Sequence, residues 1–155
     1  MTGEPTTQTK TLTCYYANVQ PVNRVVVPVR HPLSRNSKRT LAKAIELASE
    51  RGAELTVLHV NLYQTGRSIT RADLKRSVER EFGRLDRVRY VVRTGFLVEE
   101  TILDEVAAES ADLVVIGHKQ MSRWRRALRR ITNNPDIEQF LTEKLECAVV
   151  TVGEF

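Results

Sequence analysis

The sequence DLVVIGHKQMSRWRRALRR, at residues 112–130, joins a buried strand to a run of cations. Residues 113–116 are apolar and mostly β-branched, which is typical of a strand covered on both faces. Gly117 then permits a turn or a close approach that a Cβ atom would forbid. Open α/β sheets bind ligands in loops beyond the carboxyl ends of their parallel strands. The cations after Gly117, with no acidic residue among them, therefore predict an anion site, most naturally for phosphate.

Outward from this stretch, short apolar runs alternate with amphipathic segments. Right-handed crossovers between such elements give a five-stranded, parallel, doubly wound α/β sheet of Rossmann-like type, with helices on both faces. Ser37 is expected to cap the first helix and Gly52 to end it, and Thr70 with Asp73 resembles a capping box for the second. The expected strands are residues 24–29, 55–60, 88–93, 113–116 and 148–152, and the expected helices are residues 37–51, 70–85, 97–110 and 135–145.

Length and composition indicate one globular domain. The 155 residues carry a net charge of +5, which favours anionic partners without proving any. Cys14 and Cys147 lie far apart without metal-binding spacing, so neither a zinc site nor a disulfide framework is expected. No apolar run could span a bilayer and no signal peptide is present, so the cytoplasm is the expected location. Residues 1–21 are expected to form a flexible arm and residues 22–153 a single domain.

The expected sheet also predicts where the basic run lies. If the chain reverses direction in the sheet after the third strand, the first and fourth strands become neighbours. The loops after Val29 and Ile116 then flank one crevice, with Arg30 and His31 opposite residues 117–123. A solvated face remains the alternative interpretation of this run. For a nucleic-acid partner, Trp124 is the residue of the run that is available for stacking. The acids Glu99, Glu100, Asp104 and Glu105 are expected to form a solvated helix face.

With this order of elements, residues 24–152 resemble the universal stress protein family. The likeness lies in the VVVPV and LTVLHV strands, the GFLVEETILDEVAAESADLVVIG block and the closing CAVVTV strand. The resemblance implies a Rossmann-like fold of the adenine nucleotide alpha hydrolase-like type, and a family in which some members bind ATP and others do not. It also implies a homodimer through the last strand, here Ala148, Val149, Val150, Thr151 and Val152.

The sequence departs from the ATP-binding members of that family at two places. Those members carry Gly-x-x-Gly-x9-Gly-Ser/Thr after strand four and an aspartate at the end of strand one. Here Gly117 matches only the first glycine, and Arg30, a pure hydrogen-bond donor, stands at the aspartate position. Arg30 could contact an anion, pair with a carboxylate or fill the adenosine pocket. The other motif positions hold Gln120, Arg130 and Ile131, with Thr132 one residue late.

These observations favour binding over catalysis. No GxSxG, P-loop or HxGH motif and no metal-ligand cluster is present, so no enzyme activity beyond weak ATP hydrolysis is expected. The leading hypothesis is a non-catalytic regulatory or binding module of the stress response that does not bind ATP in the family's usual way. One alternative is a switch that binds ATP or another adenine nucleotide by its phosphates, through the basic loop after strand four. Another is an adaptor for acidic proteins or for nucleic acid, contacted at its backbone and not by base sequence. The candidate ligand contacts are Pro28, Val29, Arg30, His31, Val60, Gly117, His118, Lys119, Gln120, Ser122, Arg123, Arg130, Ile131 and Thr132.

Overall fold

The structure is a computed structural model, which describes residues 22–132 and 146–153 and, within residues 127–132, the backbone alone. The N-terminal arm expected at residues 1–21 and the helix expected at residues 135–145 lie outside the described residues. The elements are, in chain order, β1 (Arg24–Pro28), α2 (Arg35–Arg51), β2 (Glu54–Leu62), the 3-10 turn η1 (Tyr63–Thr65), α3 (Arg71–Phe82), β3 (Val88–Gly95), α4 (Val98–Glu109), β4 (Leu113–Gly117), α5 (His118–Thr132) and β5 (Ala148–Val152).

The strands form one five-stranded sheet in the order β3-β2-β1-β4-β5, and every pair is parallel. β1 lies at the centre, between β2 and β4. The chain winds outward from β1 to β3, crosses back to β4 and winds outward again to β5. This topology confirms the predicted fold class, and it creates a topological switch point between β1 and β4.

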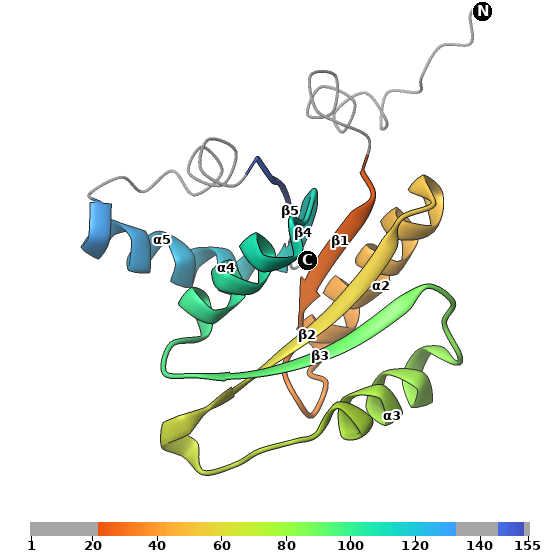
Figure 1. Cartoon of the computed structure of the whole chain (residues 1–155), viewed down its shortest axis with the longest axis horizontal. Helices are drawn as coiled ribbons and strands as arrows, with labels where there is room; N and C mark the ends of the chain where they lie inside the picture. Colours follow the sequence, from red (N-terminus) through yellow and green to blue (C-terminus); the bar gives the residue numbers. More distant parts are fainter. Residues whose placement is uncertain (1–21, 133–145, 154–155) are drawn as a thin grey trace, which may run out of the picture.

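Helices cover both faces of the sheet, as Figure 1 shows. Because side chains alternate along a strand, Val25 and Val27 pack with the buried residues of α2 and α3, whereas Val26 packs with those of α4 and α5. The two cores are thus built from opposite faces of the same central strand. Burial on both faces explains why β1 and β4 read as continuous apolar runs in the sequence.

The local signals for helix ends are confirmed in two cases and wrong in one. Thr70 and Asp73 form the capping box of α3, and Gly52 ends α2 in the left-handed conformation with φ of 62°. Ser37, however, does not cap α2. It lies inside the first turn, and its backbone nitrogen donates to the hydroxyl of Ser34, the residue with the extended backbone that a cap requires.

The basic stretch after β4 is a helix from its first residue, and the expected loop between strand and cations is absent. β4 ends at Gly117 and α5 begins at His118. Met121 and Trp124 bury one face of α5 against the sheet, and each is 2% exposed or less. The expectation that Trp124 is available for stacking is therefore wrong, because its ring belongs to the core.

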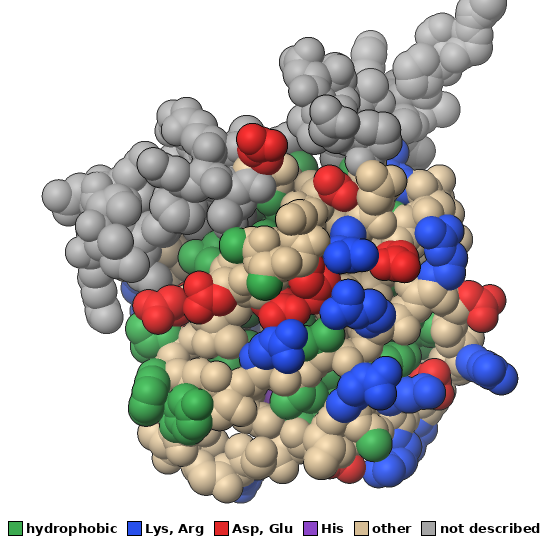
Figure 2. Space-filling view, in the orientation of Figure 1, with side chains coloured by type: hydrophobic (Ala, Val, Ile, Leu, Met, Phe, Trp, Pro, Cys, Tyr) green, Lys and Arg blue, Asp and Glu red, His purple; other side chains and the backbone are tan. Residues whose placement is uncertain are grey.

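The acidic residues of α4 do not form the uniformly solvated face that was expected. Glu100 and Asp104 are exposed, but Glu105 is buried, and so is Glu109 one turn later. The solvated-face prediction fails for Glu105 because Arg93 on β3 donates to its carboxylate, with Nε 2.7 Å from Oε1. Figure 2 shows acidic side chains with Lys and Arg side chains beside them over β3 and α4.

Candidate functional site

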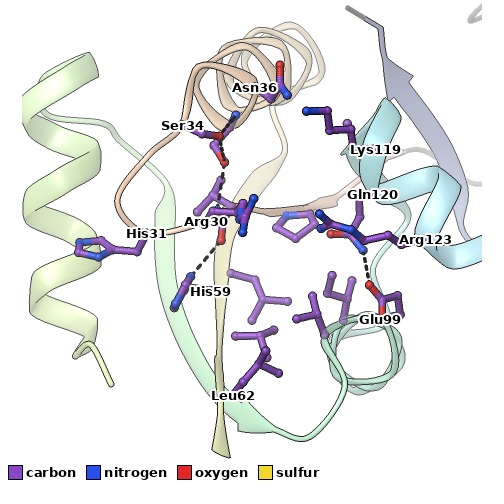
Figure 3. A pocket seen from close by; sticks show the side chains of 18 of the residues that line it. Arg30, His31, Ser34, Asn36, His59, Leu62, Glu99, Lys119, Gln120 and Arg123 are labelled. Atoms are coloured by element: carbon purple, nitrogen blue, oxygen red, sulfur yellow. Dashed lines mark hydrogen bonds between the residues drawn. The ribbon is translucent and has the colours of Figure 1, made fainter. Parts of the chain in front are cut away.

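A crevice of about 820 Å³ opens at the carboxyl ends of β1, β2 and β4. Its walls come from the segment after β1, the first turns of α2 and α5, and the turn between β3 and α4, several of which Figure 3 shows. The volume lies within the range of about 300–1,000 Å³ that is usual for small-molecule sites. Because β1 and β4 are neighbours, the segments after Val29 and Ile116 flank this one crevice, as expected.

Three cations meet at one end of the crevice, here called the cationic end: Arg30, Lys119 and Arg123. Figure 3 shows them coming from opposite sides, Arg30 from the segment after β1 and the other two from α5. Among the described residues, none of the three takes part in an ion pair. Like charges that converge raise the energy of the empty site, and a bound anion relieves that cost.

The amino end of α2 adds to the positive field of the cationic end. Ser34 caps the helix, and the hydroxyl of Ser37 accepts a hydrogen bond from the backbone nitrogen of Arg30 at 3.0 Å. This bond ties the segment after β1 to the start of the helix. The first turn of α2 contains no acidic residue, so its unpaired backbone N–H groups and its dipole also favour an anion.

Gly117 serves this end by permitting a close approach, and not by a turn. It is the last residue of β4, and a Cβ atom placed on it would lie 3.2 Å from the hydroxyl oxygen of Thr40 on α2. The hydroxyl of Thr40 in turn donates to the carbonyl of Asn36 at 2.8 Å. The glycine therefore lets α2 and the start of α5 lie close together at the crevice.

One acidic side chain, Glu99, lines the crevice among the described residues. It comes from the first turn of α4, and its Oε2 accepts a hydrogen bond from Nε2 of Gln120 at 3.2 Å. The basic run thus has an acidic neighbour, Glu99, which lies outside the run in the sequence and comes close to it only in the fold. Glu99 neutralises part of the field, but its hydrogen bond is to an amide, and the three cations outnumber it.

Two histidines form a fixed part of the wall. Nδ1 of His59 donates to the carbonyl of Val29 at 3.0 Å, and burial, followed by the nearby His31, lowers the pKa of His59. His59 is therefore neutral near pH 7 and holds the segment after β1 against β2. His31 turns toward α3, where its Nε2 lies 2.9 Å from the hydroxyl of Ser77. His118 is exposed at the first residue of α5 and also lines the crevice.

Apolar side chains gather at the opposite end of the crevice, beside Gln64, Thr65 and Arg67. Leu62 at the end of β2 and Phe96 and Leu97 in the β3–α4 turn form what is here called the apolar wall. The ring of Tyr63 packs against that of Phe96, with centroids 4.6 Å apart. This feature could not be predicted from the sequence, because apolar residues at the start of a helix, such as Phe96 and Leu97, usually pack into the core.

Most candidate contacts come together at this crevice, and a few do not. Ser122 does not line it, because its hydroxyl donates to the carbonyl of His118 within α5. Arg130, Ile131 and Thr132 lie in the part of α5 whose side chains are not described. The candidates that line the crevice are Pro28, Val29, Arg30, His31, Val60, Gly117, His118, Lys119, Gln120 and Arg123.

Sequence reasoning missed the polar residues of α2, which line the crevice beside the cationic end. The predicted topology could have found them, since the first turn after a β1 loop lies at the switch point. It could not have found the contribution of the β3–α4 turn, which depends on how far β3 extends. The missed lining residues include Ser34, Asn36, Ser37, Thr40, Phe96, Leu97 and Glu99.

Within residues 22–132 and 146–153, no three His, Cys, Asp or Glu side chains gather as a metal site would need. No helix in the same part has both the length and the apolar character to cross a bilayer.

Comparisons with known proteins agree with the fold. A sequence model of the universal stress protein family matches residues 21–134. No curated protein matches the chain. Among solved structures, the universal stress protein UspA from Lactobacillus plantarum superposes with a TM-score of 0.56 at 18% identity, covering 86% of this chain and 99% of that one.

Two other solved structures give similar values. A universal stress protein from Archaeoglobus fulgidus has a TM-score of 0.53 and 18% identity, with 83% of this chain and 97% of that chain covered. A universal stress protein in complex with cAMP has a TM-score of 0.54 and 16% identity, with 86% and 98% covered. At such identities the likeness of the structures establishes a shared fold.

Proposed function

Because this chain belongs to the universal stress protein family, for which a role in stress response is general, we propose that it acts there as a non-catalytic, cytoplasmic binding module. Its crevice takes a phosphorylated small molecule, and adenine nucleotides are the first candidates. The phosphates are held by cationic side chains and by the amino end of α2, in place of a glycine-rich loop.

The observation that carries this proposal is the convergence of Arg30, Lys119 and Arg123 on one crevice without an ion pair among the described residues. Arginine forms paired hydrogen bonds with phosphate oxygens, and lysine adds a compact point charge. The crevice lies at the switch point of a parallel sheet, which is where such sheets bind nucleotides. One neighbour in fold was solved in complex with cAMP, which makes cAMP a useful probe beside ATP, ADP and AMP.

Isothermal titration with ATP, ADP, AMP and cAMP tests this function. Wild-type protein should bind at least one of them saturably, with one ligand per chain. Arg123→Gln should weaken that binding about tenfold or more, because a hydrogen bond to a charged group contributes about 1.5–3 kcal/mol. Rising salt should also weaken binding, although less for contacts inside the crevice than for exposed ones.

Arg126→Gln is the matched control. Arg126 lies on the same helix and is exposed, but it does not line the crevice. Its substitution should leave the dissociation constant within about twofold. Absence of saturable binding by wild type to all four nucleotides at millimolar concentration would remove the proposal, and so would equal effects of the two substitutions. The adaptor hypothesis stays a prediction, and Arg125 and Arg126 are the exposed cations it would use.

A further inference from the structure

The large hydrophobic side chains that are exposed within residues 22–126 and 146–153, where side chains are described, all lie at one place. They are Tyr63, Phe96 and Leu97, which are 57%, 69% and 57% exposed. Figure 2 shows hydrophobic side chains gathered on the surface at the lower left, where Figure 1 places the ends of β2 and β3. Exposed apolar side chains that cluster beside a cavity indicate a surface that binds something.

Hydrogen bonds hold these side chains in their exposed positions. The carbonyl of Phe96 accepts from Nε2 of Gln64 at 2.9 Å, and the carbonyl of Leu97 accepts from the hydroxyl of Thr101 at 2.8 Å. Gly95 allows Thr101 to approach the turn, because the position of a Cβ atom there would overlap the Thr101 hydroxyl. The β3–α4 turn is therefore fixed from both sides, and Phe96 and Leu97 are presented outward by its backbone.

The apolar wall is continuous with the interior of the crevice. Leu62, Phe96 and Leu97 line the crevice together with Val60 and Ile102 from its floor. The cationic end lies across the same crevice, with Arg30, Lys119 and Arg123. The crevice thus offers a place for negative charge at one end and for apolar surface at the other.

Two polar side chains near the apolar wall, those of Asn61 and Thr65, are already hydrogen-bonded within the protein. Asn61 makes three hydrogen bonds, two to Ile69 and one to Ser68. The hydroxyl of Thr65 donates to the carbonyl of Leu62 and accepts from the nitrogen of Arg67. A nucleobase bound at this end would need hydrogen-bond donors and acceptors from the protein to recognise its edge, whereas a hydrocarbon needs none. Arg67 can lay its own methylene groups along such a chain.

We propose that the crevice binds an amphiphilic anion, in which a phosphate head lies among the three cations and a flexible apolar chain runs along the apolar wall. This inference rests on the proposed binding of phosphate at the cationic end and names the ligand class that suits the whole crevice. The apolar chain of the ligand covers protein side chains that are otherwise exposed to water, so the length of that apolar chain contributes directly to affinity.

Titration with methyl, butyl, hexyl and octyl phosphate, each kept below its micelle concentration, tests the inference. Every methylene that reaches the apolar wall should tighten binding by about two- to fourfold, since burial of a CH₂ group contributes about 0.8 kcal/mol. The double substitution Phe96→Ser and Leu97→Ser should flatten this dependence, so that octyl phosphate binds little more tightly than methyl phosphate. The variant should fold, because both side chains are exposed and serine is a favoured residue at the cap position that Leu97 holds before α4.

A second variant separates the contribution of the phosphate head of the ligand from that of its alkyl chain. Arg123→Gln should weaken all four alkyl phosphates by the same factor and leave the dependence on chain length intact. A wild-type affinity that does not change with chain length, while nucleotides still bind, would overturn the amphiphile inference and leave the proposed function standing. If neither class binds, both fail.

Two other results would also overturn it. The first is an affinity that depends equally on alkyl-chain length in wild type and in the double variant, which would mean that the alkyl chain binds elsewhere on the protein. The second is a loss of self-association in the double variant without any effect of chain length on wild-type binding. In that case the apolar wall is an interface between copies of this chain.

Discussion

At the scale of single residues, the buried acids of α4 show what a sequence pattern cannot tell. Glu105 and Glu109 are four positions apart, a spacing that equally suits a solvated helix face. Their burial depends on Thr56 and Arg93, which come from strands that only the folded sheet brings beneath α4. The hydroxyl of Thr56 donates to Oε1 of Glu109 at 2.8 Å, whereas Arg89 lies 3.8 Å from Oε2, too far for a hydrogen bond.

This arrangement separates the titration of the two carboxyl groups. Burial, together with the neighbouring Glu105, raises the pKa of Glu109 to about 7. For Glu105, burial acts in the opposite direction, but hydrogen bonds from Glu109 and Arg93 outweigh it and hold its pKa below the usual value. Glu109 is therefore protonated in the folded protein at a mildly acid pH at which the unfolded chain has lost that proton.

Glu109→Gln should remove this pH dependence. Between the unfolded pKa of 4.5 and the folded value of about 7, the folded state binds the extra proton, so wild-type stability falls as pH rises through that window. Glutamine keeps an oxygen for Thr56 and donates to Glu105 without titrating. We expect the variant to match wild type near pH 5 and to exceed it by on the order of 1–3 kcal/mol near pH 7.5, in urea unfolding curves. A constant difference between the two proteins from pH 5 to pH 7.5 would contradict this account.

At the scale of elements, Asp112 joins three strands at their amino ends, which lie opposite the crevice. The backbone nitrogen of Asp112 donates to the carbonyl of Arg24, and its carbonyl accepts from the nitrogen of Ala148. Its carboxylate accepts from the backbone nitrogens of Asn23 and Arg24 at 2.8 and 2.9 Å. Asp112 therefore fixes the start of β1 against the start of β4, and with it the register that forms the switch point.

Asp112→Ala should cost about 1–3 kcal/mol, because it leaves two backbone donors without their acceptor. Asp112→Asn keeps a carbonyl oxygen in the same place and should lose less. Urea unfolding followed by Trp124 fluorescence measures both, since Trp124 is buried in the core and is the single tryptophan of the chain. Equal stability of the alanine variant and wild type would show that the carboxylate does not hold the strands together.

The sequence predicted the elements better than their ends. The period of apolar residues located all five strands, because burial on both faces or on one face leaves a clear pattern. The start of α2 was misplaced because Ser34 and Ser37 are chemically equivalent caps, and only the backbone angles choose between them. The absence of a loop before α5 was missed because a run of like charges is a poor helix signal, whereas Met121 and Trp124 supply the packing that overrides it.

At the scale of the whole molecule, topology decided how much of the site could be predicted. The sequence analysis took a reversal after β3 as its condition, and the structure has that reversal, which brings Arg30 and Lys119 to the same crevice. The apolar wall could not be inferred in this way, because it depends on how far β2 and β3 extend past the crevice. The cationic end was therefore predictable from the sequence and the apolar end was not.

Among the described residues, this topology leaves two edges of the sheet without a neighbouring strand, and the two edges differ in a way that bears on dimer formation. β5 forms one edge and β3 the other. The β3 edge carries the exposed arginines Arg89 and Arg93, which disfavour pairing with another strand. β5 is short and apolar, and its partly buried Val150 and Val152 face no further strand. We therefore propose that a homodimer forms by pairing of β5 across a two-fold axis.

A pair of matched substitutions tests this dimer. Thr151→Lys adds an exposed charge to the β5 edge, and Thr94→Lys adds the same charge to the exposed face of β3 at the opposite edge. The backbone nitrogen of Ala148 donates to the carbonyl of Asp112, the residue before β4, so it points toward β4. Because this direction alternates along the strand, the backbone nitrogen of Thr151 points to the free edge, where a partner strand would meet it. Light scattering after size exclusion should show a dimer for wild type and Thr94→Lys, and a monomer or a weakened dimer for Thr151→Lys. A wild-type monomer at every concentration would refute the proposal, whereas a dimer lost only in Thr94→Lys would move the interface to β3.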